Sequence, residues 1–147
     1  MDCELICSWY EQYKNGIYRY ALSITKDACV AEDVLHDTFL KALSGKHAFA
    51  PEKAQAWFYR VARNLCYDYL RREKREGYYA QPPACEEASY AYIEMIASLA
   101  PKEREIVTLK IVGGLTHREI GAVLGITTKA AQKRYERAIA ALRDKEE

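Results

Sequence analysis

Residues 114–137 read GLTHREIGAVLGITTKAAQKRYER, a pattern typical of two short helices joined by a tight turn. Thr116 and Glu119 form a T-x-x-E capping box, which predicts a helix start because each side chain can satisfy a free backbone N–H group. Gly125 predicts the end of that helix, since glycine readily adopts the left-handed conformation found there. Thr127 can then cap a second helix. This stretch therefore predicts a helical hairpin with a defined turn.

The second helix of this hairpin is basic, and small residues lie where the two helices would cross. Gly121 and Ala131 leave room for a close crossing. This order matches the helix-turn-helix, whose second helix enters the major groove of DNA. An ordinary hairpin with a solvated basic face is the alternative, but the cap, the glycine turn and the small residues together favour DNA binding. The polar residues of the second helix are Lys129, Gln132, Lys133, Arg134, Glu136 and Arg137.

The composition fits one domain or two small ones. The chain has 147 residues, half of them apolar, and a net charge of +1. Basic residues concentrate in residues 60–75 and 129–137, whereas Glu32, Asp33 and Asp37 form an acidic patch. This distribution suggests two DNA contacts and one basic protein partner. No secretory signal or membrane-spanning run is evident, so we expect a cytoplasmic protein.

The cysteine pattern indicates reduced thiols. The five cysteines lie at positions 3, 7, 29, 66 and 85, without a C-x-x-C pair or zinc-finger spacing. A thiol-based sensor using Cys3, Cys7 and Cys85 is an alternative. No metal site, cofactor, small-molecule substrate or catalytic constellation is indicated, and we expect no enzyme.

Apolar residues recur about every 3.6 residues along the chain, which predicts an all-α fold. Pro82 and Pro83 cannot lie inside a helix, so a flexible linker is expected at residues 77–88, between small helical domains at 1–76 and 89–147. In the helix expected at residues 30–43, Leu35, Phe39, Ala42 and Leu43 should face the core. The expected helices span residues 3–25, 30–43, 53–74, 87–99, 101–112, 116–124 and 127–143.

The third expected helix interleaves aromatic residues with cations, in AWFYRVARNLCYDYLRREKR at residues 56–75. Aromatic side chains stack on unpaired bases while neighbouring cations hold phosphates, so this helix suits single-stranded DNA. For Phe58 and Tyr69 a place in the core is preferred. Trp57 could serve in either role.

Three segments together resemble bacterial RNA polymerase sigma factors of the extracytoplasmic-function (ECF) class. They are AEDVLHDTFLKAL at 31–43, AWFYRVARNLCYDYLRR at 56–72 and LAPKEREIVTLKIVGGLTHREIGAVLGIT at 99–127. The order and spacing match over nearly the whole chain, which is far more specific than a lone helix-turn-helix. That class consists of region 2 and region 4, joined by a linker.

The resemblance implies roles and partners. The partners would be core RNA polymerase, at the clamp helices of its largest subunit and at its flap region, promoter DNA and an anti-sigma protein. Polymerase contacts would be Asp33, Asp37 and Leu40. The −10 element would be bound as a single strand, with a flipped base, by Lys46, His47, Phe49, Trp57, Arg60, Asn64 and Arg71. The −35 duplex would be read by Lys129, Gln132, Lys133, Arg134 and Arg137, with Arg118 on phosphate.

The chain departs from the family pattern at several positions. His36 replaces a usual glutamine, so a polar contact to polymerase can differ. Ala131, Gln132 and Tyr135 differ from the usual recognition helix, which leaves the −35 sequence open. Glu136 is expected to pair with Lys133 rather than to contact a cytosine.

A stand-alone helix-turn-helix regulator that does not engage polymerase is the main alternative function. A plain regulator would have no need for Asp33, Asp37 and Leu40 on one helix face. The sequence therefore favours a sigma factor that directs promoter-specific initiation.

Overall fold

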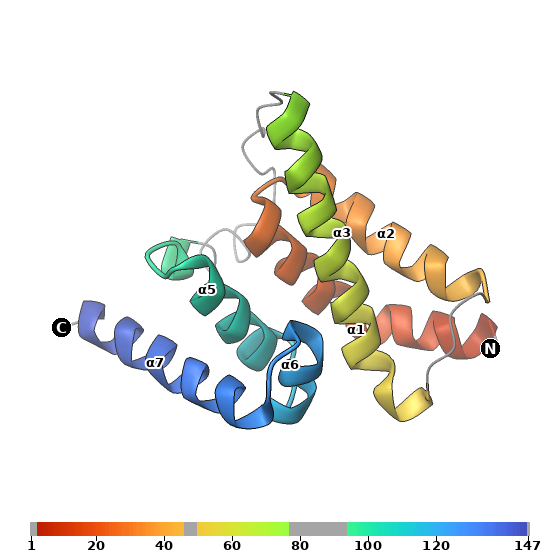
Figure 1. The fold of residues 1–147 in the computed structure, drawn as a ribbon. Helices are drawn as coiled ribbons and strands as arrows, with labels where there is room; N and C mark the ends of the chain where they lie inside the picture. The colour runs from red at the N-terminus through yellow and green to blue at the C-terminus, as the bar shows by residue number, and fades with distance from the viewer. Residues whose placement is uncertain (1–2, 46–49, 77–93, 147) are drawn as a thin grey trace.

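The computed structural model describes residues 3–45, 50–76 and 94–146, and within them every regular element is helical (Figure 1). The all-α prediction is thus confirmed. Of the expected helix at 87–99, residues 94–96 are helical and residues 87–93 lie outside the described part. The elements are α1 (Cys3–Thr25), α2 (Ala28–Leu43), the short 3-10 helix η1 (Pro51–Lys53), α3 (Ala54–Glu76), α5 (Pro101–Val107), the π-helical turn η2 (Thr108–Val112), α6 (His117–Leu124) and α7 (Thr128–Glu146).

Helices α1, α2 and α3 pack around an aromatic core. Asp27 starts α2, because its carboxylate accepts the N–H groups of the first turn. Phe58 of α3 is fully buried and stacks on Phe39 of α2 at 4.4 Å between ring centroids. Trp9 of α1 packs edge-to-face with the Phe58 ring, with the two ring centroids 5.8 Å apart. The core position expected for Phe58 is confirmed.

One inward position of α2 was predicted wrongly. Leu43 is 47% exposed, although Phe39 and Ala42 are buried as expected. Leu43 is the last residue of α2, so no further residue of this helix packs over its side chain. An apolar residue at a helix end can therefore face solvent even when its helical spacing fits the core.

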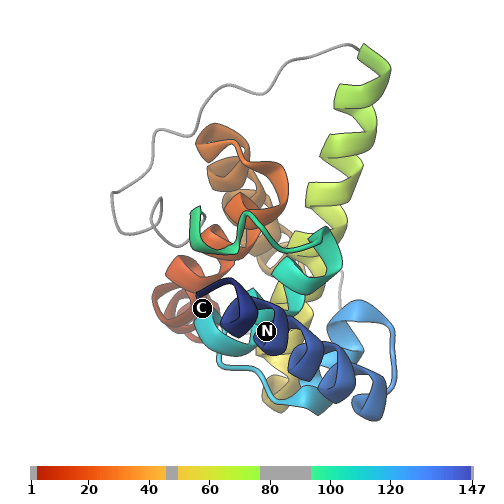
Figure 2. The ribbon, with the colours of Figure 1, turned by 90° about the vertical axis from the view of Figure 1, so that its left-hand side faces the viewer.

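The second unit is built from α5, η2, α6 and α7. Pro101 occupies the start of α5, where its missing N–H costs little. Leu109, Leu115 and Ile120 are fully buried beneath these helices. α7 packs on α5 and α6, on the side of the molecule opposite to α2 (Figures 1 and 2).

The two units lie against each other and share one continuous buried cluster. α1 packs on α5 and η2, while α3 packs on α6. Gln55 of α3 donates a hydrogen bond to the carbonyl oxygen of Gly113 at 2.6 Å. The two-unit architecture agrees with the prediction, but this close packing was not expected. The predicted linker at 77–88 lies outside the described residues.

Candidate nucleic-acid interface

The predicted helix-turn-helix is formed by α6 and α7. The Thr116 hydroxyl accepts the Glu119 N–H at 3.2 Å, and the Glu119 carboxylate accepts the Thr116 N–H at 3.0 Å, which confirms the capping box. Gly125 ends α6 in the left-handed conformation, with φ at 72°. A Cβ on Gly121 would lie only 2.7 Å from the carbonyl oxygen of Ile126. Glycine at 121 therefore allows the turn to fold tightly against α6.

A polar stripe of α7 faces solvent. The Thr127 hydroxyl accepts the Ala130 N–H at 3.1 Å, so the predicted cap is confirmed. Ala131 and Ala138 are buried against the rest of the unit. On the opposite side of α7, exposed polar residues recur every three or four positions. This exposed stripe is therefore free to enter a DNA groove. It consists of Lys129, Gln132, Lys133, Glu136 and Arg137.

Two details of this region differ from a uniform basic face. Arg134 is half-buried and lies off the exposed stripe. Glu136 accepts a hydrogen bond from the amide of Gln132 at 3.3 Å, so the expected pairing with Lys133 is wrong. The exposed Lys133 ammonium would gain little from an ion pair with Glu136, because both groups are well hydrated at the surface. Arg118 is exposed on α6.

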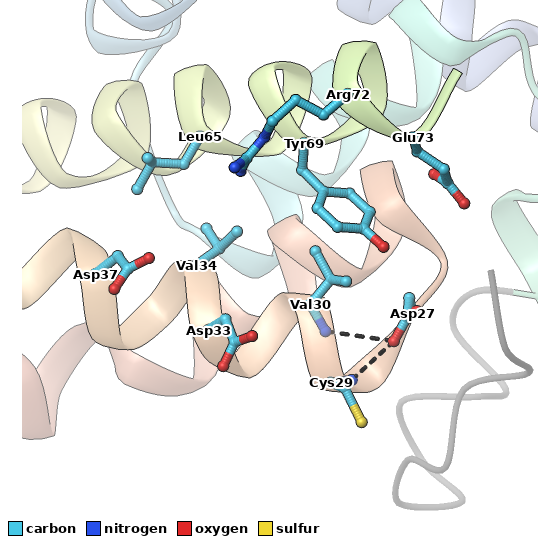
Figure 3. A pocket seen from close by; sticks show the side chains of 10 residues that line it. All are labelled: Asp27, Cys29, Val30, Asp33, Val34, Asp37, Leu65, Tyr69, Arg72 and Glu73. Atoms are coloured by element: carbon cyan, nitrogen blue, oxygen red, sulfur yellow. Dashed lines mark hydrogen bonds between the residues drawn. The ribbon is translucent and has the colours of Figure 1, made fainter. Parts of the chain in front are cut away.

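The outward face of α2 is acidic with an exposed apolar residue. Asp33, His36 and Asp37 are all exposed, and Leu40 is 60% exposed. Asp33 and Asp37 border a groove of about 470 Å³ between α2 and α3 (Figure 3). Arg72 projects from α3 along this groove. Carboxylates beside an exposed leucine suit a basic protein partner with an apolar contact.

The residues predicted for the −10 element are divided in the structure. Trp57 is half-buried, with its ring 5.2 Å from Phe58 in an edge-to-face contact. It therefore serves the core on one side, while its other side lines a cleft. Asn64 and Arg71 are exposed farther along α3, and Arg71 pairs with Asp68. Lys46, His47 and Phe49 lie outside the described residues.

The cleft beside Trp57 brings together residues that the sequence assigned to different DNA sites. It has a volume of about 520 Å³. Trp57 and Arg60 line it from α3, and Arg118, Glu119 and Ala122 line it from α6. The predicted −10 and −35 contacts therefore approach each other at this point.

Sequence reasoning missed a buried carboxylate at the contact between the units. Glu105 of α5 is 3% exposed. Its Oε1 accepts hydrogen bonds from Tyr20 Oη and Arg63 Nε, both at 2.8 Å, and its Oε2 accepts one from Tyr67 Oη at 2.7 Å. The available signal was an acidic residue directly before the apolar pair Ile106 and Val107, because a carboxylate that is buried with such neighbours needs hydrogen-bond partners.

The surroundings of Glu105 hold its neighbours in their protonated forms. Burial, reinforced by the Glu105 charge, raises the pKa of Tyr20 well above its usual value. The same causes raise the pKa of Cys66 to about 12. The Arg63 guanidinium also lies over the Tyr67 ring, 4.8 Å from its centroid. The site thus binds one carboxylate with two neutral phenols and one cation.

The described parts of the chain contain neither a candidate metal-binding cluster nor a candidate membrane-spanning helix. Residues 3–45, 50–76 and 94–146 contain no cluster of three histidine, cysteine or acidic side chains that could hold a metal ion. None of the helices described there combines the length and apolar character needed to span a bilayer.

Solved structures share this fold. CnrH, solved with the cytosolic domain of CnrY, superposes with a TM-score of 0.74 at 24% identity, over 95% of this chain and 85% of that one. The sigma factor RpoE from Bartonella quintana, solved with the anti-sigma factor NepR, gives 0.71 at 21% identity, over 93% and 95%. At these identities the likeness establishes the fold.

Sequence comparison establishes the family. Residues 9–76 match sigma-70 region 2, and residues 89–142 match sigma-70 region 4. The chain is 28% identical to the ECF RNA polymerase sigma factor SigE of Mycolicibacterium smegmatis, over 93% of this chain and 61% of that protein. It is 31% identical to the ECF RNA polymerase sigma factor SigM of Bacillus subtilis, over 80% of each. With both regions present in order, the chain belongs to the ECF family of RNA polymerase sigma factors.

Proposed function

We propose that this sigma factor acts through two domains, residues 1–76 and 89–147, with residues 77–88 as the linker. As an ECF sigma factor it binds core RNA polymerase and directs promoter-specific initiation of transcription. The matches to region 2 at 9–76 and region 4 at 89–142 support these boundaries. The chemistry of RNA synthesis belongs to the polymerase, and the sigma factor selects the start site in the cytoplasm.

The first proposed contact is between α2 and the clamp helices of the largest polymerase subunit. Asp33, Asp37 and Leu40 form it, and the observation that carries this assignment is their shared exposure on one face of α2. The carboxylates attract a basic surface, and Leu40 supplies an apolar anchor. Region 4 would make a second contact at the flap region.

The second proposed contact is with promoter DNA. The exposed stripe of α7 enters the major groove of the −35 duplex, and its cap and glycine turn support this because they fix the helix orientation. Lys129, Gln132, Lys133, Arg134 and Arg137 are the proposed −35 contacts, with Arg118 on phosphate. Lys46, His47, Phe49, Trp57, Arg60, Asn64 and Arg71 are the proposed −10 contacts.

An anti-sigma protein is a further proposed partner. CnrH was solved with the cytosolic domain of CnrY, and RpoE with the anti-sigma factor NepR. The cleft between α3 and α6 supports such binding, because its aromatic and charged lining can accept a polypeptide.

Run-off transcription tests this function directly. Purified core polymerase is incubated with genomic DNA from the source organism, with and without the protein. Discrete new 5′ ends that appear only with the protein are expected, and their upstream sequences would reveal both promoter elements. An absence of new starts, together with retained binding to duplex DNA, would instead indicate a stand-alone regulator.

A further inference from the structure

We propose that the Glu105 site is a latch that holds the two domains of the free protein closed, and that full engagement of polymerase and promoter requires the latch to open. The proposal rests on the proposed function, because it concerns access to the assigned DNA and polymerase contacts. It assigns to Tyr20, Arg63, Tyr67 and Glu105 a regulatory role rather than a contact with either partner.

The donors of the latch all come from the opposite domain. Tyr20 belongs to α1, and Arg63 and Tyr67 belong to α3, whereas Glu105 belongs to α5. Each donor is far from Glu105 in sequence, from 38 positions for Tyr67 to 85 for Tyr20. Among the described residues, every side-chain hydrogen bond to the Glu105 carboxylate therefore depends on the closed arrangement.

The chemistry of the latch makes closure all-or-none. A buried carboxylate is tolerated only when charged and hydrogen-bonding partners are in place. Arg63 and Tyr67 are one helical turn apart on α3 and contact each other, so a single face of this helix presents both donors to Glu105. A small displacement of α5 would strip the carboxylate of several donors together, which favours a fully closed or a fully open protein.

A second contact fixes the same arrangement. The side chain of Tyr59 is buried between the domains, where Gly16 of α1 and Gly113 after η2 leave space for it. A Cβ added at Gly16 would overlap Tyr59 Oη, and one added at Gly113 would lie 3.1 Å from the same atom. The fit of this side chain against both domains sets how α5 and η2 dock on α1.

The closed form is too small to reach both promoter elements. Their names place them about 25 base pairs apart, or roughly 85 Å along B-DNA at about 3.4 Å per base pair. A compact chain of this length has a radius of gyration of about 15 Å, which corresponds to a diameter of about 40 Å. In addition, Trp57 and Arg60 share a cleft with α6 in the closed form.

Small-angle X-ray scattering of the full chain tests the latch without labels. The closed wild type should give a radius of gyration of about 15 Å, and separation of the domain centres to about 35 Å would raise it to about 20 Å. Glu105→Ala, Arg63→Gln and Tyr67→Phe remove the carboxylate or one of its donors. Glu105→Ala is expected to produce the larger value. Glu11→Gln is the matched control, because it removes an exposed carboxylate paired with Lys14 on the surface of α1.

Affinity for core polymerase provides the second readout. If only the open form engages polymerase through both domains, the apparent Kd falls as the open fraction rises. We expect Glu105→Ala to tighten binding at least about tenfold, because it removes several charge-assisted hydrogen bonds from the closed form only. Arg63→Gln and Tyr67→Phe should change affinity in the same direction, and Glu11→Gln should leave it unchanged.

The outcomes separate the latch from the proposed function. Unchanged scattering in all three latch variants overturns the latch, whatever happens with polymerase. If Glu105→Ala loses its helical circular dichroism, Arg63→Gln and Tyr67→Phe decide, since each keeps most of its side chain. If the wild type and the opened variants all fail to bind polymerase, the proposed function fails while scattering still reports on closure.

Discussion

Replacing Gly121 with alanine should destabilise the helix-turn-helix, although alanine is the better helix former. The new methyl group would lie 2.7 Å from the carbonyl oxygen of Ile126 and 3.5 Å from that of Thr127. Both oxygens belong to the backbone and cannot rotate away, so the turn itself has to move. Overpacking of this kind costs about 2–3 kcal/mol, and the gain in helix propensity offsets about 1 kcal/mol. The expected net loss is about 1–2 kcal/mol of unfolding free energy.

Thermal unfolding followed by circular dichroism measures this loss. For a chain of this length, 1 kcal/mol shifts Tm by about 2–4 °C, so we expect Gly121→Ala to lower Tm by about 2–8 °C. Ala122→Gly is the control, because Ala122 is exposed on the same helix and the reverse exchange there involves propensity alone. Duplex binding by Gly121→Ala should also weaken, since the start of α7 is displaced. A rise in Tm would refute the reasoning, because it would mean that propensity dominates and that the close approach is absent.

Three further predictions test the proposed surfaces and the thiol chemistry. Reversing the charge of Asp33 and Asp37 together should abolish co-purification with core polymerase and leave binding to the −35 duplex unchanged; retained co-purification would contradict the assignment of that face. Arg134→Ala should weaken −35 binding by about 1–3 kcal/mol in a sequence-dependent way, whereas Lys133→Ala should mainly lower the salt dependence, by a slope of about 1; duplex affinity unchanged in both variants would mean that another helix binds. Cys66 should resist alkylation at pH 8 in the native protein, because burial raises the pKa of its thiol to about 12 and the thiol therefore stays protonated at pH 8. Mass-spectrometric mapping that finds Cys66 modified as readily as the exposed Cys29 would contradict this.

Local signals in the sequence were sufficient for the helix-turn-helix. The capping box at Thr116 and Glu119, the left-handed Gly125 and the cap at Thr127 all appear in the structure. Each depends on residues within a few positions of one another, so the chain around them hardly matters. The outward face of α2 was predictable for a similar reason, since helical periodicity alone separates Asp33 and its neighbours from the core.

Predictions that needed side-chain detail or distant contacts failed. Leu43 follows the inward spacing of α2, yet its side chain is 47% exposed at the end of the helix. Glu136 had two possible partners on the same helix, and periodicity could not distinguish Gln132 from Lys133. Glu105 required knowledge that α1 and α3 would supply its donors from 38 to 85 positions away. No local rule connects residues at such separations.

The positions of the proposed surfaces suggest the order in which the protein engages its partners. The acidic face of α2 and the stripe of α7 are both exposed in the closed form, and the two helices lie on opposite sides of the molecule (Figures 1 and 2). Trp57 and Arg60 instead line the cleft shared with α6. Polymerase can therefore bind α2 before the latch opens. The flap region of polymerase then competes for region 4 with the latch donors Tyr20, Arg63 and Tyr67. Because the second contact is intramolecular once the first is made, a modest affinity at the flap is enough to shift the equilibrium toward the open form. Charge reversal on α2 should accordingly reduce polymerase binding even in the opened Glu105→Ala protein, since the first step is lost whether or not the latch holds.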